Sequence, residues 1–305
     1  MPARTKALLM NLGALLCWSF VPLVIRFLSS YYSALFQVLF RYLAALIVLW
    51  CFTVAALGLK RLGAEMPRLF SLWPKLLLIA VANYGFQLTF TLSLYLLYPG
   101  LVTLVSQSLV LFSVFLAALM FPDERSTLGS ALFLAGVAAA VIGVVMTIVG
   151  SASFASVRFS LGIVIVLASA LFWALTGAMI RKWLGGLSTS VALSSVFTVV
   201  AVLFFLTYLI FYRALPVPSA PAVIWALLVL SGLIGVGVGY YLYFRSVGIL
   251  GLALSSSLSL LIPLLVGAAS FFLFREILTW IQLAGGVILL TGCYLVIRAR
   301  FRHIE

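Results

Sequence analysis

The chain has 305 residues, of which 66% are hydrophobic and only 8% are charged, and its mean hydropathy is +1.34. A soluble domain is about 25% charged and leaves about a quarter of its chain surface in water, so this composition excludes a soluble enzyme, a nucleic-acid-binding domain and a disordered tail. The net charge of +13 is instead typical of basic cytoplasmic loops in a membrane protein.

Charged, polar and proline-containing breaks divide the chain into ten apolar segments, each near the length of about 20 residues that crosses a bilayer. These predicted spans cover residues 7–27, 33–57, 74–97, 101–121, 128–149, 160–181, 190–211, 222–244, 250–273 and 279–297. The longest break is 58–73, so no segment remains for a soluble domain. We predict an all-α, multi-pass cell-membrane protein, monomeric or homodimeric, whose partners are the lipid bilayer and a small-molecule substrate, with no nucleic acid.

The basic residues predict the orientation of the chain, because Lys and Arg concentrate in cytoplasmic loops. With the N-terminus in the cytoplasm, thirteen basic residues lie inside: Arg4, Lys6, Lys60, Arg61, Arg68, Lys75, Arg125, Arg181, Lys182, Arg245, Arg298, Arg300 and Arg302. Four lie near the outside: Arg26, Arg158, Arg213 and Arg275. We therefore expect both termini in the cytoplasm.

The two halves of the chain share four features in the same order, with shifts of 155, 154 and 152 residues for the first three and an equal glycine spacing for the fourth. Residues 18–26 match 173–181, 85–90 match 239–244, 121–124 match 273–276, and the pair Gly136 and Gly143 matches Gly285 and Gly292. This pattern predicts two five-helix repeats, residues 1–150 and 151–305. Because five is odd, the second repeat enters the membrane from the opposite side, and such inverted repeats are typical of alternating-access transporters.

These features resemble the drug/metabolite transporter superfamily, specifically its EamA-type ten-helix members. The resemblance rests on the Trp18 region, residues 40–45, the Glu that closes the fourth helix of each half, Pro263 thirteen residues before the second of these, and the glycine-spaced last helices. It implies a transporter of small organic metabolites. Three departures are that no proline matches Pro263 in the first half, that no Gly follows Trp18, and that Val196 stands where Arg41 would recur.

Arg41 lies about eight residues, or about 12 Å, into the second predicted span. A charge at that depth costs at least about 2.5 kcal/mol unless it is paired, solvated or able to snorkel. One reading is a cation that attracts a carboxylate or phosphate of the substrate. The other is a guanidinium that snorkels to the outer surface or caps helix carbonyls.

Further polar and aromatic residues inside the spans are candidates for the substrate pathway. Asn83, Gln87 and Thr91 recur at helical spacing, and buried amides avoid lipid. Trp18 and Trp173 occupy equivalent positions in mid-span. The candidates are Trp18, Arg41, Asn83, Tyr84, Gln87, Gln107, Trp173, Tyr240 and Tyr241. Helix packing and interhelical hydrogen bonding are the alternative roles for these side chains.

A second group is interpreted as structural or hinge residues. Two prolines interrupt spans, two glycines belong to a run of spaced glycines in the eighth span, and two glutamates stand near helix ends beside an Arg, where a structural anchor is the simpler role. These residues are Pro22, Glu124, Gly235, Gly239, Pro263 and Glu276.

Catalytic and metal sites are not expected, because the single His is His303 and no span contains an Asp or Glu away from its end. We predict no enzyme activity and no cofactor. The preferred function is export of amino acids or related metabolites, by resemblance and by the aromatic and amide residues. Efflux of cationic or aromatic drugs, nucleotide-sugar or sugar-phosphate exchange, and a non-transport role are the alternatives.

Overall fold

A computed structural model describes residues 3–121, 130–151, 156–212 and 218–302, and within these ranges the chain is helical with no β-strand. The α-helices of the first half are α1 (Ala3–Leu28), α2 (Ala34–Ser71), α3 (Trp73–Leu96), α4 (Pro99–Val105), α5 (Leu109–Met120) and α6 (Ala131–Val149). Those of the second half are α7 (Val157–Met179), α8 (Thr189–Tyr212), α9 (Ala222–Ser231), α10 (Tyr240–Ser259), α11 (Ile262–Phe274) and α12 (Trp280–Arg302). A 3₁₀ turn, η1 (Ser106–Ser108), and two π-helical stretches, η3 (Ile180–Leu184) and η4 (Gly232–Gly239), continue adjacent helices.

The apolar segments form the membrane-crossing helices that their length predicts. In the described part of the chain, nine helical stretches are long and apolar enough to cross a bilayer, and the shorter apolar α11 adds a tenth segment. Large apolar side chains such as Leu16, Ile47 and Phe272 face outward, where only lipid could cover them. The prediction of a multi-pass helical membrane protein is confirmed.

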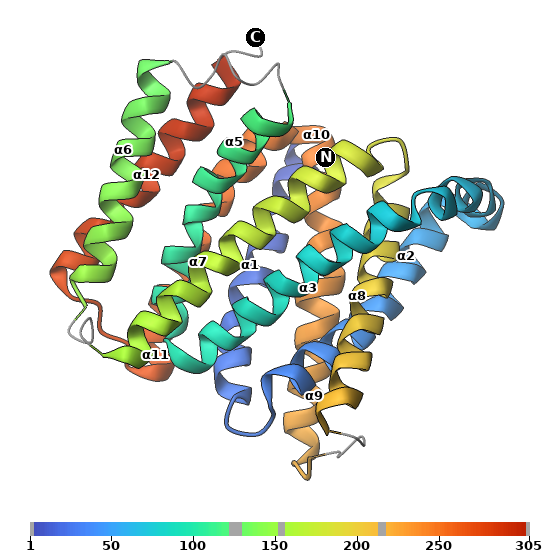
Figure 1. The fold of residues 1–305 in the computed structure, drawn as a ribbon, viewed down its shortest axis with the longest axis horizontal. Coiled ribbons are helices and arrows are strands. Elements are labelled where there is room, and N and C mark those ends of the chain that lie inside the picture. Colours follow the sequence, from blue (N-terminus) through green and yellow to red (C-terminus); the bar gives the residue numbers. More distant parts are fainter. Residues whose placement is uncertain (1–2, 122–129, 152–155, 213–217, 303–305) are drawn as a thin grey trace.

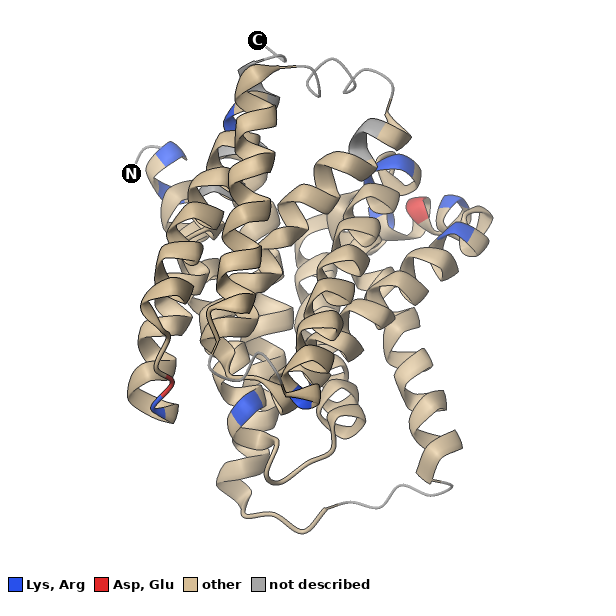
Figure 2. Cartoon of the chain, turned by 60° about the vertical axis from the view of Figure 1, so that its left-hand side comes forward, with Lys and Arg blue, Asp and Glu red and all other residues tan. Residues whose placement is uncertain are grey.

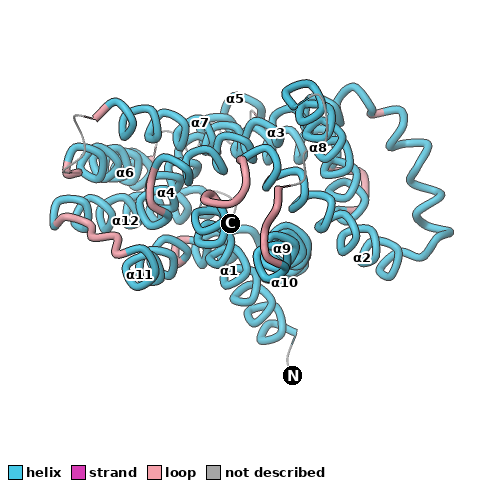
Figure 3. The backbone as a smooth tube through the Cα atoms, turned by 90° about the horizontal axis from the view of Figure 1, so that it is seen from below, coloured by secondary structure: helices cyan, strands magenta, loops and turns pink. Residues whose placement is uncertain are grey.

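The prediction that residues 58–73 form a break is wrong, because α2 continues beyond its membrane span to Ser71. Gly58 takes φ 71° and ψ 158°, a conformation that favours glycine, and there the helix changes direction. Leu62, Met66 and Leu69 then follow at helical spacing and pack on the core. The segment projects from the bundle on the right of Figures 1 and 3 and carries basic side chains on its exposed face.

The predicted break between the eighth and ninth spans also differs from the structure. Helix α10 runs without interruption to Ser259, and the non-helical pair 260–261 separates it from α11. The corresponding helix of the first half is broken as well, because η1 lies between α4 and α5. Both halves therefore interrupt their fourth apolar segment partway along its length, at different sequences.

Helices α6 and α12 form the most extensive contact in the molecule, and they lie side by side on the left of Figure 1. A Cβ on Gly143 would stand 2.3 Å from the backbone nitrogen of Leu289, and one on Gly292 would stand 2.3 Å from that of Ala140. The two backbones therefore touch directly, and the matched glycines of the two halves make this possible.

The charged residues of the described chain gather mainly at the two ends of the bundle (Figure 2). The N-terminal end of α1 and the C-terminal end of α12 lie toward the same end, where most Lys and Arg are found. At the opposite end, Nη1 of Arg26 donates to the carbonyls of Leu94 and Tyr95, each at 3.1 Å, and so caps the C-terminus of α3.

Candidate functional site

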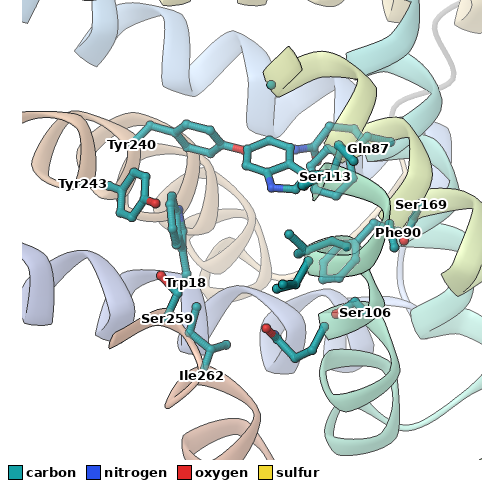
Figure 4. A pocket seen from close by; sticks show the side chains of 18 of the residues that line it. Trp18, Gln87, Phe90, Ser106, Ser113, Ser169, Tyr240, Tyr243, Ser259 and Ile262 are labelled. Carbon is teal, nitrogen blue, oxygen red and sulfur yellow. The ribbon is translucent and has the colours of Figure 1, made fainter. Parts of the chain in front are cut away.

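A cavity of about 580 Å³ lies inside the bundle and is lined by residues of both halves of the chain. This volume falls in the range of small-molecule sites, about 300–1,000 Å³. Figure 4 shows Trp18 of α1 with Tyr240 and Tyr243 of α10 on one side, and Gln87, Phe90, Ser106, Ser113 and Ser169 of α3, η1, α5 and α7 on the other. The helices that line the cavity thus include both interrupted apolar segments.

Aromatic rings form one continuous part of the lining. The ring of Tyr240 stands edge-on to both tryptophans, with centroids 5.2 Å from Trp18 and 5.7 Å from Trp173. Trp173 also contacts Phe86 at 4.6 Å, and Trp18 contacts Tyr243 at 4.9 Å. These rings offer faces on which a planar or apolar group can stack.

The indole of Trp18 is held in place by the glycine-rich stretch of the second half. Its Nε1 donates to the carbonyl of Gly235 at 3.1 Å, within η4. A Cβ at Gly235 would overlap Val21, and a Cβ at Gly239 would stand 3.0 Å from the Trp18 ring. Both predicted glycines therefore permit close packing of α1 on η4, whereas their proposed hinge role stays a prediction.

Arg41 is 2% exposed and contributes to the lining of the cavity. Its Nε and Nη1 atoms are buried and have no hydrogen-bond partner among the described residues. Arg41 therefore neither reaches the membrane surface nor caps a carbonyl of this part of the chain.

Amides and hydroxyls supply most of the remaining polar lining. Gln87 and Gln107 both reach the cavity, and Nε2 of Gln107 donates to the carbonyl of Thr103 at 3.3 Å. The Ser169 hydroxyl donates to the carbonyl of Val166 at 2.7 Å, which leaves its oxygen able to accept. The lining given by the described residues contains two arginines, Arg41 and Arg181, and no Asp or Glu.

Three of the predicted pathway residues lie outside this cavity. Asn83 is buried and accepts from the Tyr42 hydroxyl at 2.6 Å. The Tyr84 hydroxyl donates to Thr207 at 3.1 Å. Tyr241 packs its ring on Phe52, with centroids 4.3 Å apart. Six of the nine candidates, Trp18, Arg41, Gln87, Gln107, Trp173 and Tyr240, do line the cavity.

Glu276 contacts the start of α4, and Pro263 stands at the start of α11. The Glu276 carboxylate accepts from the backbone N–H groups of Gly100 and Leu101, each at 2.8 Å, and so caps α4 across the two halves. Ser270 also donates to it. Pro263 stands in the first turn of α11 rather than in a helix interior, whereas Pro22 lies inside α1 and lines the cavity. Glu124 lies outside the described residues.

Several lining residues were not predicted. Phe90 and Tyr243 each follow a predicted residue, Gln87 and Tyr240, by three positions, so helical spacing could have found them. Phe86 directly precedes Gln87 and also lines the cavity. Arg181 was interpreted only as a topology and repeat signal, yet it lines the cavity, and its Cζ lies 4.2 Å from the ring centroid of Phe121. Ser113 and Ser169 carried no signal beyond a small polar residue in a span.

Within the described ranges, no group of three or more His, Cys, Asp and Glu side chains is placed to hold a metal ion. The cysteines Cys17, Cys51 and Cys293 are free. The site is therefore built from rings, amides, hydroxyls and guanidinium groups, which bind and orient a ligand through stacking and hydrogen bonds.

The comparisons with known proteins agree with this architecture. Residues 160–298 match the model of the EamA-like transporter family. A Salmonella typhimurium protein described as a "Probable amino-acid metabolite efflux pump" is 28% identical over 256 residues, which is 78% of this chain and 83% of that protein. A solved crystal structure has the same fold, with a TM-score of 0.60 and 20% identity over 96% of this chain and 98% of its own.

Proposed function

We propose that this chain, an EamA-type member of the drug/metabolite transporter superfamily, exports amino acids or related small metabolites across the cell membrane by alternating access. The observation that carries the proposal is the cavity between the two halves, which has the volume of a metabolite site and a lining of rings, amides and hydroxyls. The name of the Salmonella relative supports this substrate class. Transport rather than catalysis is the function toward which the family points.

Inverted repeats at residues 1–150 and 151–305 are supported by matching contacts in the two halves. Gly85 of α3 packs on Phe172 of α7, and its counterpart Gly239 packs on Cys17 of α1, which is the counterpart of Phe172. Likewise, α1 contacts α10 as α7 contacts α3. A twofold exchange of the halves reproduces such pairs, as alternating access by inverted repeats requires.

The cytoplasmic orientation of both termini is supported by the charged residues, because most Lys and Arg stand at the end of the bundle where the termini lie. In this orientation the cavity extends toward the cytoplasm, since Phe121, Arg181 and Ile297 belong to its lining. The opposite end is joined by contacts of Arg26, Gln37 and Tyr95, which are absent from the lining. The conformation therefore corresponds to an inward-facing state, ready to accept a cytoplasmic substrate.

Efflux of cationic drugs is the alternative, and the aromatic rings of the cavity fit a planar drug. The two arginines of the lining argue against a cationic substrate, because like charges repel strongly in a site of low dielectric. The described lining residues also include no carboxylate that could pair with the cation. Nucleotide-sugar or sugar-phosphate exchange is less well supported, because among the described arginines only Arg41 is buried deep in the bundle, where it could bind phosphate.

Flux in proteoliposomes tests the proposal. A panel of labelled amino acids is measured beside an aromatic cation, each with and without imposed pH and voltage gradients. We expect saturable amino-acid flux that is independent of the pH gradient. Proton-driven flux of the cation without amino-acid flux would show that the drug-efflux alternative is correct.

Matched variants connect the flux to the cavity. We expect Gln87→Ala and Trp18→Ala to reduce amino-acid flux at least tenfold, because both side chains line the cavity. Tyr241→Ala is the control, since Tyr241 lies outside the cavity against Phe52. If all three variants and the unchanged chain show equal flux, the cavity is not the site of transport, and its assignment as the substrate site is refuted.

A further inference from the structure

Arg41 differs from the arginines near the ends of the bundle in the way its charge is compensated. Arg26 donates to two carbonyls at the end of α3, and Nη2 of Arg158 donates to the carbonyl of Tyr95 at 3.1 Å. Arg41 is more deeply buried than either, yet two of its three guanidinium nitrogens have no partner. A buried cation normally requires a partner, so the site is electrostatically incomplete.

Acidic residues of the described chain do not supply the missing partner. The Glu276 carboxylate is engaged with α4 and Ser270, and Glu65 accepts from the backbone N–H and the hydroxyl of Ser188. The other lining arginine, Arg181, lies against the face of Phe121 and has a further interaction of its own. Among the described residues no acidic side chain is therefore available to Arg41, and a ligand in the cavity is a source of the missing anion.

We infer that Arg41 binds the carboxylate of the transported molecule, and that this charge, rather than an ammonium group, is what the site recognises. The inference depends on the proposed function in one respect, which is that this cavity is the substrate site. The guanidinium offers several N–H donors to a carboxylate in a medium where charge-assisted hydrogen bonds are strong. Trp18, Trp173 and Tyr240 surround the same space and fit an apolar or aromatic side chain.

The ammonium group of an amino acid finds no opposite charge in the described lining. It meets amide oxygens such as those of Gln87 and Gln107, hydroxyls, and the faces of the rings. Removal of the ammonium group therefore leaves the main contact intact, whereas removal of the carboxylate abolishes it. The substrate class is accordingly that of organic monocarboxylates with an apolar side chain, of which amino acids are one kind.

Equilibrium binding to the purified full chain in lipid nanodiscs tests this inference without any requirement for flux. All probes carry a phenyl ring and differ in their polar group: 3-phenylpropionate, L-phenylalanine, 3-phenylpropanamide, 2-phenylethylamine and phenyl phosphate. We expect the two carboxylates to bind within tenfold of each other and at least tenfold more tightly than the amide and the amine. Equal binding of the amide or amine, or binding of phenyl phosphate at least tenfold tighter than the carboxylates, would overturn the inference.

The matched variants are Arg41→Gln and Arg245→Gln, since Arg245 is an exposed arginine that lies over Tyr241, outside the cavity. We expect the first to lose at least tenfold in 3-phenylpropionate affinity and the second to bind normally. Unchanged binding in Arg41→Gln would refute the inference, and should that variant fail to fold, the probe series on the unchanged chain decides. A chain that binds carboxylates but transports none would refute the proposed function alone, whereas amino-acid flux with equal amide binding would refute only this inference.

Discussion

Gly232 positions Arg41, and its replacement by alanine is the most direct test of how packing controls the site. A Cβ at Gly232 would stand 2.4 Å from the carbonyl oxygen of Arg41 and 2.7 Å from its Cα. Both are backbone atoms, so no side-chain rotation relieves the overlap. The backbones of α2 and η4 must separate by about 1 Å for the first contact to reach an ordinary distance of 3.4 Å.

The cost of this separation can be compared with the gain from replacing glycine. Overpacking of a close contact costs about 1–3 kcal/mol, and alanine in a helix gains about 0.5–1 kcal/mol over glycine. Gly232→Ala should therefore be destabilised on balance. Gly267→Ala in α11 is the control, because a Cβ there meets no atom within 4 Å and only the gain remains.

Thermal unfolding in the same detergent measures the difference between these variants, and binding of 3-phenylpropionate measures the effect on the site. We expect Gly232→Ala to unfold at a lower temperature than the unchanged chain and Gly267→Ala at an equal or higher one. Displacement of Arg41 should also weaken carboxylate binding by about tenfold, or about 1.4 kcal/mol. If Gly232→Ala is as stable as Gly267→Ala and binds normally, the close approach of Gly232 to Arg41 does not constrain the site.

Three further substitutions test other contacts. Trp18→Phe removes the indole N–H that donates to Gly235, and thermal unfolding should show a loss of about 0.6–1.7 kcal/mol in stability. Trp280→Phe is its control and should have no such effect, because the Trp280 side chain is 86% exposed. Glu276→Gln keeps one acceptor oxygen for two N–H groups of α4 and should lose about 1–3 kcal/mol; stability equal to that of the unchanged chain would contradict this cap. Gly143→Ala should lower the unfolding temperature because its Cβ meets only backbone atoms of α12, and an unchanged temperature would contradict direct backbone contact.

The helical architecture could be predicted because span length and charge breaks depend on local composition. The segment after Gly58 was missed because its polar residues resemble a loop, and only the packing of Leu62, Met66 and Leu69 against the core makes it helical. In the same way, Arg245 led to a predicted break at 245–249, yet α10 continues through these residues to Ser259.

The candidate site could be predicted only in part, and Gln87 and Tyr241 illustrate the reason. The repeat places these two residues at equivalent positions, yet only Gln87 lines the cavity. The π-helical η4 precedes Tyr241, whereas α3 has no such stretch before Gln87. The neighbouring equivalent pairs, Phe86 with Tyr240 and Phe90 with Phe244, line the cavity in both halves, so η4 does not turn the whole helix face. The difference is confined to the Gln87 and Tyr241 position, which the repeat alone does not predict.

The direct backbone contact between α6 and α12 constrains how these two helices can rearrange. Side chains that interlock can exchange rotamers and settle into a second arrangement, but backbones that meet at Gly143, Gly285 and Gly292 have no such alternatives. Separation of the two helices would expose the whole contact at once. If the halves rearrange during transport as we propose, we therefore expect α6 and α12 to stay together and the interrupted segments around α4 and α11 to change instead.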